Sequence, residues 1–259
     1  MSIRVSSLAI LCLFSTHAWA ADYYVSSAGN DKGAGSSFNP WKSLARVNRQ
    51  SYKAGDRILF QGGATFSGAI TFSSSSAGTG ASPITVTSYG TGRALIAAGN
   101  GVGLSAYNTA GFLIQNINFQ GSGASSNTDN GIKFYADLSG GVKLDTVDVD
   151  QVDVSGFHMY GISIGAWNGP TGFKNVRITN VHAHDNGLAG IETWGPSDPS
   201  NVWYPHQNIY IGHCQTYNNL GLASTSGSGS GILVGAANGV TIERSVAYNN
   251  VVTLWPRGA

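Results

Sequence analysis

Five segments of the chain share one pattern of alternating apolar and polar residues, and they recur at a nearly fixed interval. Their first residues lie 30, 34, 33 and 31 positions apart. The segments are Phe112–Phe119, Val142–Val149, Val176–Ala183, Ile209–Thr216 and Val240–Ala247. A second string begins with Gly-Ile and lies between them, at Gly131, Gly161, Gly190 and Gly231. A fixed period of this length indicates one structural unit that is stacked many times.

The repeated unit is built from strands, because its residues alternate over short runs. We expect three strands per coil. The Gly-Ile string supplies one, and the longer string supplies two that meet at a bend at Asn116, Thr146, Asn180, His213 and Arg244. The sequence therefore predicts an all-β fold, a right-handed parallel β-helix with three sheets, over residues 21–250. An antiparallel sandwich or barrel is the alternative, but it would not need so regular a register.

Two further features fit a solenoid. Asparagines fall in register at Asn186, Asn219 and Asn250, where stacked amides can satisfy turn backbone and one another. Residues 40–50 read as a short amphipathic helix with Asn39 as N-cap and Pro40 as its first residue. Its apolar face is predicted to carry Trp41, Leu44, Ala45 and Val47. We expect this helix to cover the N-terminal end of the core, within a cap region at residues 21–60.

The N-terminus reads as a secretory signal peptide over residues 1–20. Arg4 is followed by an apolar run from Leu8 to Phe14 and by the cleavage pattern Ala18–Ala20. The run is too short for a transmembrane anchor. We therefore expect an exported protein, secreted or periplasmic. Cys12 would be removed, which leaves Cys214 as a buried free thiol.

Composition excludes two classes. The chain has 14 basic and 13 acidic residues, so the loss of Arg4 leaves a net charge of zero. Nucleic-acid binding would normally need a basic face. Charged residues make up 10% of the chain, but hydrophobic residues reach 42% and are periodic, so disorder is not the explanation.

The C-terminal residues 251–259 break the repeat and form an atypical tail. We interpret them as the premature end of a longer solenoid; the alternative is that they fold over the last coil. An open apolar end is predicted to favour end-to-end self-association.

The coil repeats and several opening segments together resemble the pectate-lyase-like (pectin lyase fold) superfamily of right-handed β-helix proteins. The segments are Tyr23–Asp31, Asn39–Leu44, Ala54–Phe60 and Pro83–Val86. The resemblance covers nearly the whole exported chain and is specific for the fold, which hosts many functions. It implies an exported bacterial protein, and in related lyases and hydrolases the active site lies on the sheet of the Gly-Ile string and on the turns beside that sheet.

Alternation places two columns of side chains on the outside of that sheet. One column holds Lys133, Ser163, Glu192 and Leu233, and the next holds Tyr135, Gly165, Trp194 and Gly235. Lys133 and Glu192 are the candidate catalytic residues, and Tyr135, Trp194 and nearby Trp167 are candidate sugar platforms. The alternative is that Lys133 and Glu192 are ordinary exposed residues. The loop from Gly195 to Gln207 follows Trp194 and is expected to wall this groove or simply to fill surface.

Asn127–Asp129 and Gly161–Gly165, with His158 nearby, resemble part of the polygalacturonase-like hydrolase pattern, so Asp129 and His158 are candidate substrate-binding residues. That pattern also needs an Asp-Asp pair and an Arg-Ile-Lys string, and both are absent. Since glycoside hydrolysis needs two carboxylates, a lyase is the stronger hypothesis. It would use a base such as Lys133 and a cation at the uronate carboxylate.

A third sheet is expected to pair Asp148 with His182 and Asp150 with His184 on adjacent coils, which would raise the pKa of each histidine. Asp148 and Asp150 are also weak candidates for a Ca²⁺ site. Cross-strand ion pairing on a solvated face is the alternative. The best-supported function is thus to cleave or bind extracellular polysaccharide. A non-catalytic carbohydrate-binding or surface structural protein, or an inactive fragment of a longer enzyme, is the alternative.

Overall fold

The computed structural model describes residues 20–196, 203–222, 225 and 228–251. The predicted signal peptide, except Ala20, and the tail after Val251 lie outside the described residues, as does the middle of the predicted groove-wall loop, residues 197–202. End-to-end self-association stays a prediction. Within the described ranges, no helix has the length and apolar character needed to cross a membrane.

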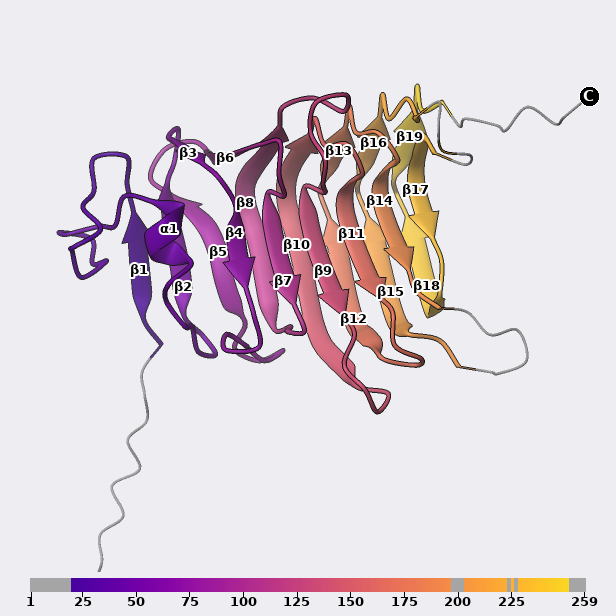
Figure 1. Cartoon of the computed structure of the whole chain (residues 1–259), viewed down its shortest axis with the longest axis horizontal. Helices are drawn as coiled ribbons and strands as arrows, with labels where there is room; N and C mark the ends of the chain where they lie inside the picture. Colours follow the sequence, from indigo (N-terminus) through magenta and orange to yellow (C-terminus); the bar gives the residue numbers. More distant parts are fainter. Residues whose placement is uncertain (1–19, 197–202, 223–224, 226–227, 252–259) are drawn as a thin grey trace, which may run out of the picture.

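The chain winds into a solenoid with three faces, each a stack of parallel strands (Figure 1). The first face contains β1 (Asp22–Val25), β2 (Arg57–Gln61), β5 (Ile84–Tyr89), the first halves of β8 (Phe112–Gly121) and β10 (Lys143–Ser155), β12 (Gly172–Thr179), β15 (His206–Gly212) and β18 (Ala237–Glu243). The second face contains β3 (Thr65–Ser67), β6 (Ala94–Gly99), the second halves of β8 and β10, β13 (His182–His184), β16 (Gln215–Tyr217) and β19 (Val246–Tyr248).

The third face is the sheet of the Gly-Ile string. It contains β4 (Ile70–Phe72), β7 (Leu104–Tyr107), β9 (Ile132–Ala136), β11 (Tyr160–Ala166), β14 (Ala189–Trp194) and β17 (Ser230–Val234). The strands run in register, so Leu104, Ile132, Ile162, Ile191 and Ile232 form one inward column. The predicted parallel β-helix is therefore confirmed, and β4 and β7 add two coils before the first Gly-Ile string.

Stacked aromatic and branched side chains fill the interior. Phe72, Phe112, Phe134 and Phe173 follow one another along the solenoid axis, with ring centroids 4.8, 5.9 and 6.1 Å apart. Burial of such rings on every coil supplies the hydrophobic stabilisation that an isolated coil lacks. Cys214 lies in this core as a buried free thiol, as predicted.

A single left-handed residue makes the corner between the first and second faces on five coils. These residues are Asn116, Gln151, Asn180, His213 and Arg244, with φ between 49° and 56°. Asparagine tolerates this conformation better than most residues. The predicted bend at Thr146 is wrong, because Gln151 takes that place in β10.

The strand β10 is shifted by five residues from the predicted register. Val147, not Val142, lies opposite Phe112 and Val176. Asp148 consequently faces Arg177, Asp150 faces Thr179, and Asp153 faces His182. The predicted Asp148–His182 and Asp150–His184 pairs are therefore wrong.

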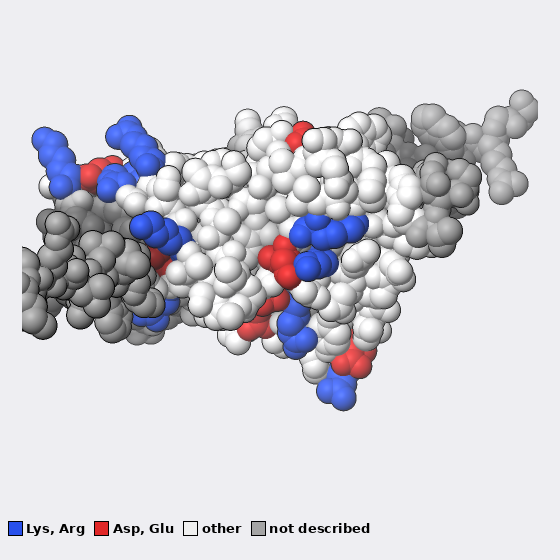
Figure 2. All heavy atoms as spheres, turned by 90° about the horizontal axis from the view of Figure 1, so that it is seen from below, with Lys and Arg blue, Asp and Glu red and all other residues white. Residues whose placement is uncertain are grey.

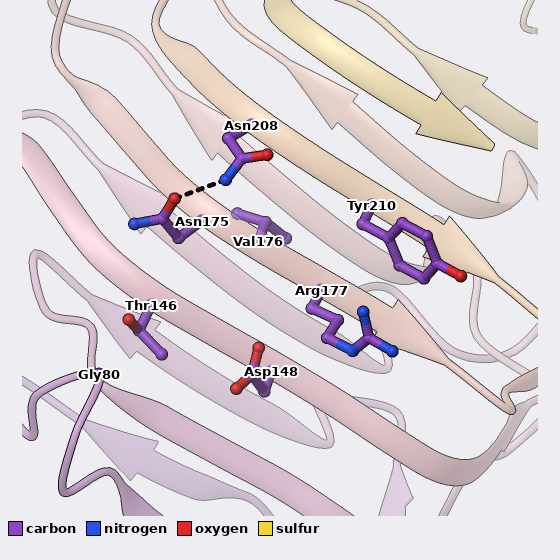
Figure 3. A pocket seen from close by; sticks show the side chains of 8 residues that line it. All are labelled: Gly80, Thr146, Asp148, Asn175, Val176, Arg177, Asn208 and Tyr210. Carbon is purple, nitrogen blue, oxygen red and sulfur yellow. Dashed lines mark hydrogen bonds between the residues drawn. The ribbon is translucent and has the colours of Figure 1, made fainter.

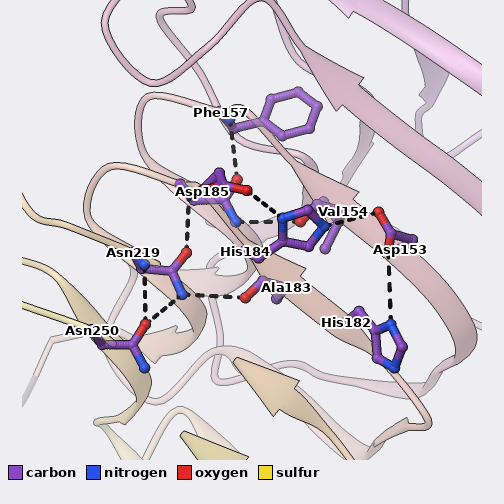
Figure 4. Close-up of polar contacts among 10 residues, drawn as sticks. Asp153, Val154, Phe157, His182, Ala183, His184, Asp185, Asn219 and Asn250 are labelled. Carbon is purple, nitrogen blue, oxygen red and sulfur yellow. Dashed lines mark hydrogen bonds and ion pairs between the residues drawn. The ribbon is translucent and has the colours of Figure 1, made fainter. Parts of the chain in front are cut away.

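A ladder of asparagines, two of them fully buried, lines the corner between the second and third faces, as the sequence predicts (Figure 4). Asn219 Oδ1 accepts from the backbone N–H of Asn186, and Asn250 Oδ1 accepts from both the backbone N–H and Nδ2 of Asn219. Asn186 Oδ1 accepts in turn from the N–H of Phe157. Each amide thus satisfies backbone groups of the preceding coil, where water is excluded.

The N-terminal end of the core is covered, but the helix there is shorter than predicted. Helix α1 spans only Leu44–Val47, and its N-cap is Ser43, whose Oγ accepts from the N–H of Arg46. Trp41 is fully buried without being helical, because it bridges to Val25 beside β1. The predicted N-cap Asn39, the first helical residue Pro40 and the buried position of Ala45 are therefore wrong, since Ala45 is exposed.

Charged side chains are sparse on the surface and gather in a few patches, which Figure 2 shows for one side of the molecule. Most of that side is formed by uncharged residues, in keeping with a charged fraction of 10%. The side in view therefore offers no wide positive area to a polyanion.

Candidate functional site

The third face carries the predicted outward column. Ser105, Lys133, Ser163, Glu192 and Leu233 lie opposite one another on β7, β9, β11, β14 and β17. Lys133 and Glu192 are two coils apart, which corresponds to about 10 Å between their backbones. Their shared face is confirmed by this register, and their catalytic roles stay predictions.

Glu192 is a buried carboxyl group. Its residue is 6% exposed, and Oε2 has no hydrogen-bond partner among the described residues. Burial raises the pKa of Glu192 to about 7, and a hydrogen bond with Tyr160 opposes that rise. Burial also raises the pKa of Tyr160, together with the charge of Glu192. A carboxyl group that is half protonated near neutral pH can both donate and accept a proton.

Aromatic rings form a continuous row beside this column. Tyr107 stacks on Tyr135 with centroids 6.0 Å apart, and Tyr135 stacks on Trp194 at 5.7 Å. Trp167 lies 6.3 Å from Trp194 at an angle of 52° and is 65% exposed. Since Tyr135 and Trp194 use ring faces on each other, Trp167 and Tyr107 at the ends of the row are the better exposed platforms. We call these four residues the aromatic row.

Gly165 allows Trp194 to reach Tyr135 two coils away. A Cβ atom on Gly165 would lie 2.4 Å from Cε2 of Trp194, so the indole occupies the place of the missing side chain. There its Nε1 donates to Ser163 Oγ at 3.0 Å. The glycine thus fixes the orientation of Trp194 across the coil of β11.

We expect Gly165→Ala to displace Trp194 and to destabilise the protein by about 1–3 kcal/mol, the usual cost of overpacking. Near-ultraviolet circular dichroism reports the lost ring contacts, and denaturant unfolding reports the stability. Gly235→Ala is the matched control two coils further, because a Cβ there meets only the Thr193 carbonyl oxygen, at 3.2 Å. Equal effects of the two substitutions would contradict this role of Gly165.

The segment after β14 is anchored to the solenoid. His206 is fully buried, and its Nε2 donates to the carbonyl of Trp194 at 2.8 Å while Nδ1 accepts from the N–H of Phe173. Burial lowers the pKa of His206 to about 4, so the ring is neutral. Lys143 Nζ donates to the carbonyls of Tyr204 and Pro205 at 2.6 and 2.7 Å. Residues 203–207 are the described end of the loop that the sequence predicts as a groove wall, and these contacts fix them beside Trp194.

Asp129 and His158 lie in turns that lead into β9 and β11. Asp129 Oδ1 accepts from the N–H and Nδ2 of Asn130, and the His158 ring pairs with the carbonyl of Ala124 through Nδ1 at 2.7 Å. Asn127 Oδ1 accepts from the N–H of His158. In the described part of the chain, neither Asp129 nor His158 forms a hydrogen bond or ion pair with Lys133 or Glu192. Their predicted role in substrate binding stays a prediction.

The second face carries a cluster of aspartates and histidines. Its aspartates are Asp153 and Asp185, not the Asp148 and Asp150 that the sequence predicts. His184 lies between Asp153, 3.3 Å from Nε2, and Asp185, 2.5 Å from Nδ1 (Figure 4). The hydrogen bond to Asp153 raises the pKa of His184, and Asp185 adds to this effect. The ring also stacks on Tyr217 at 4.6 Å. These contacts describe ion pairing on a solvated face, which is a different face from that of the Glu192 column.

Asp148 and Asp150 fit a calcium ion poorly. Asp150 Oδ1 already accepts from Thr179 Oγ1 and Asn180 Nδ2, both at 2.7 Å, and Asp148 lies opposite the positive charge of Arg177. The described ranges contain no group of three or more His, Cys, Asp or Glu side chains arranged to hold a metal ion. Calcium binding stays a prediction.

Three residues of this site were not found from the sequence: Tyr107, Tyr160 and Ser163 as a partner of Trp194. Tyr107 ends a strand without the Gly-Ile signature, so only its register with Tyr135 reveals it. Tyr160 precedes Gly161, and its contact with Glu192 crosses to the next coil. The one sequence feature that could have pointed to Tyr160 is its position directly before the Gly-Ile string at Gly161.

Comparisons with known proteins identify the fold and a relative that this chain matches over only part of its length. No protein-family model matches the chain. A lacto-N-biosidase of Bifidobacterium longum subsp. longum is 30% identical over 190 residues, which cover 63% of this chain and 12% of the relative. The chain thus spans about an eighth of the length of that curated relative.

Solved structures agree on the architecture. A GH136 lacto-N-biosidase from Eubacterium ramulus has a TM-score of 0.61 at 19% identity, covering 75% of this chain and 41% of that one. An alginate lyase from Paenibacillus sp. has a TM-score of 0.51 at 15% identity, covering 90% and 68%. The chain is therefore a right-handed parallel β-helix protein that shares its fold with these two enzymes.

Proposed function

We propose that the third face binds a glycan chain and that Glu192 transfers a proton during cleavage of a glycosidic bond. One observation carries this proposal: a buried carboxyl group with a pKa of about 7 lies on the same strand as Trp194, beside the aromatic row. Exposed rings bind the apolar faces of sugar rings, and a carboxyl group with a raised pKa is a general acid at neutral pH.

The aromatic row would hold the chain across the coils. Trp167 is 65% exposed and Tyr107 is 46% exposed, so both ends of the row offer ring surface to a ligand. The column of Lys133, Ser163 and Glu192 runs alongside this row, and Glu192 lies on the same strand as Trp194. A glycan laid along the row would therefore pass beside the carboxyl group of Glu192.

The chemistry begins with the protonated form of Glu192. Its proton passes to the glycosidic oxygen as the bond from carbon to that oxygen breaks. In β-elimination, a base removes the proton α to a uronate carboxylate, and the electron pair of that C–H bond forms the new double bond. Lys133, in the same outward column, is our candidate for this base. Polysaccharide lyase activity is thus the form of cleavage that we propose first.

Two observations support an action on carbohydrate. The partial relative is a lacto-N-biosidase, and the similar solved structures include an alginate lyase. The predicted signal peptide, with a glycan outside the cell as substrate, supports export to the periplasm or the medium. Hydrolysis would need a second carboxylate at a set distance from Glu192. None of the other described residues in its column is an acid: they are Ser105, Lys133, Ser163 and Leu233.

That lack of a second acid in the column favours one other function, glycan binding without cleavage. The two functions are separated by incubating purified protein with polyuronates and with neutral glycans. Unsaturated uronates are followed by ultraviolet absorbance, and new reducing ends by a colorimetric assay. Retention on a glycan column without any product would support binding alone. Activity that survives Lys133→Ala combined with Glu192→Ala would contradict the assigned catalytic residues.

We expect Trp167→Ala to weaken glycan binding about 3- to 10-fold, the usual worth of one stacked ring. The measurement is affinity electrophoresis in gels that contain the glycan retained best. Phe38→Ala is the control, because Phe38 is 99% exposed and lies in the N-terminal region, outside the strands of the third face. Equal retention of the Trp167 variant and the wild type would remove Trp167 from the site.

A further inference from the structure

The first face has a groove of its own, which we call the first-face groove. It encloses about 500 Å³ and crosses three successive coils. Its lining consists of Gly80, Thr146, Asp148, Asn175, Val176, Arg177, Asn208 and Tyr210 (Figure 3). An adjoining hollow of about 330 Å³ shares Asp148 and Arg177, so the depression continues beyond them.

A stack of left-handed residues forms this groove. Thr146, Asn175 and Asn208 have φ values of 71°, 55° and 54° and occupy the same position on β10, β12 and β15. Each strand is therefore kinked at the same place, and the depression runs across the strands. Asn208 Nδ2 donates to Asn175 Oδ1 at 2.7 Å, which holds the two amides in one row (Figure 3).

Arg177 lies in the groove with its donors free. Its guanidinium group packs over the ring of Tyr210, 4.5 Å from the centroid, and Tyr210 donates its hydroxyl to Glu243 Oε1 at 2.7 Å. Arg177 forms no hydrogen bond or ion pair with any other described residue. Stacking fixes the plane of the guanidinium group, so its N–H donors point into the groove without the cost of ordering a mobile side chain.

Asp148 completes the polar lining. It lies opposite Arg177 on the adjacent strand, and Figure 3 shows its carboxylate on the other side of Arg177 from Tyr210. Burial raises the pKa of Asp148, so the carboxyl group has lost part of its hydration. The groove lining thus holds one acid and one base, together with two amides and a phenol.

We propose that the first-face groove binds a neutral oligosaccharide along the solenoid axis, separately from the third face. Planar guanidinium, carboxylate and amide groups make paired hydrogen bonds with neighbouring hydroxyls of a sugar ring. Three coils span about 10 Å, which is room for two or three sugar units. Because its charges cancel, the lining offers no preference for a polyuronate. The groove shares no residue with the Glu192 site, so either proposal can fail alone.

The test titrates the Trp167→Ala protein with neutral hexasaccharides of glucose, xylose, mannose and N-acetylglucosamine, and with hexagalacturonate, by isothermal calorimetry. The Trp167→Ala substitution weakens glycan binding at the third face, so that the binding that remains can be attributed to the first-face groove. We expect at least one neutral hexasaccharide to bind, and Arg177→Ala to weaken that binding about 10-fold or more. Arg177→Lys keeps the charge but not the planar fork, so it should lose most of the same affinity.

Thr241→Ala is the matched control, since Thr241 is the exposed neighbour of Tyr210 on β18 and lies outside the groove lining. Circular dichroism verifies that every variant is folded, which surface positions of this kind should permit. Failure of all the neutral hexasaccharides to bind, binding that Arg177→Ala leaves unchanged, or selective Arg177-dependent binding of hexagalacturonate would each overturn the proposal. Loss of third-face cleavage in Glu192→Gln, with this binding intact, would be consistent with it.

Discussion

Glu192→Gln is expected to lower the rate of glycan cleavage by about 10²- to 10⁴-fold, the usual contribution of a general acid. Glutamine keeps the shape of the side chain but has no carboxyl proton to transfer. Glycan binding should change little, because the aromatic row is untouched. The measurement is the initial rate of product formation at saturating glycan, with binding measured separately.

The same substitution should increase stability at alkaline pH. Burial holds the folded pKa of Glu192 at about 7, above its ordinary value of 4.5. Between these values the folded state keeps a proton that the unfolded state releases, so stability falls as the pH rises from about 4.5 to about 7. Above pH 7 this loss is at most about 3 kcal/mol, and glutamine avoids it. Denaturant unfolding at several pH values therefore tests the burial independently of activity.

Glu243→Gln is the matched control, since Glu243 is exposed on β18 and lies on the first face. It should leave both the cleavage rate and the pH dependence of stability almost unchanged. A Glu192→Gln protein with full activity would show that this carboxyl group has only a structural role with Tyr160. An unaltered pH dependence of stability would contradict its burial as well.

Asn219→Ala is expected to destabilise the solenoid by about 3–5 kcal/mol. Asn219 is fully buried; its Oδ1 accepts from the N–H of Asn186, and its Nδ2 donates to the carbonyl of Ala183 at 3.2 Å. Alanine would leave both backbone groups without a partner in a dry site, at about 1–3 kcal/mol each, and would add a small cavity. Denaturant unfolding measures the change, and proteolysis near the corner reports local opening.

Asn218→Gly is the control that distinguishes the effect of the Asn219 side-chain amide from the effect of the backbone conformation at this corner. Asn218 is the left-handed neighbour, with φ of 55°, and glycine adopts that conformation without strain. We expect its substitution to change stability by less than about 1 kcal/mol. If the two substitutions destabilise the protein equally, the corner depends on its backbone conformation rather than on the Asn219 amide.

The third face could be predicted in detail because two constraints act on the same residues. Glycine followed by an inward isoleucine recurs at Gly161 and Gly190, and strict alternation then fixes which side chains leave the sheet. The outward positions of Lys133 and Glu192 follow from this pattern alone. The asparagine ladder was equally accessible, because its members share one place in each repeat.

The register of β10 could not be predicted because its sequence fits two alignments. Residues 142–149 and 147–154 both alternate apolar and polar side chains. The left-handed residues Thr146 and Gln151 are five positions apart: Thr146 marks the kink within the first face, and Gln151 marks the corner between the first and second faces. A left-handed residue changes which alternate side chains point inward. The predicted alignment, with its bend at Thr146, therefore places apolar residues inward as well as the observed one does. Only pairing with β8 and β12 distinguishes the two.

The electrostatic character of the site could not be read from the sequence either. The protonation of Glu192 depends on its burial, and burial depends on neighbours from adjacent coils, such as Tyr160. The helix was overestimated for a similar reason. Trp41 bridges to Val25, and this tertiary contact takes precedence over the helical periodicity of residues 40–50.

The contact between Trp194 and Tyr135 has a consequence for the modularity of the solenoid. The free energy of a repeat protein is ordinarily a sum of terms for each coil and for adjacent coils. Because Trp194 passes over Gly165, this contact adds a term between coils that are not adjacent. Duplication or deletion of the intervening coil would keep the backbone stack but separate the two rings. The third face therefore constrains coil number in a way that the fold itself does not.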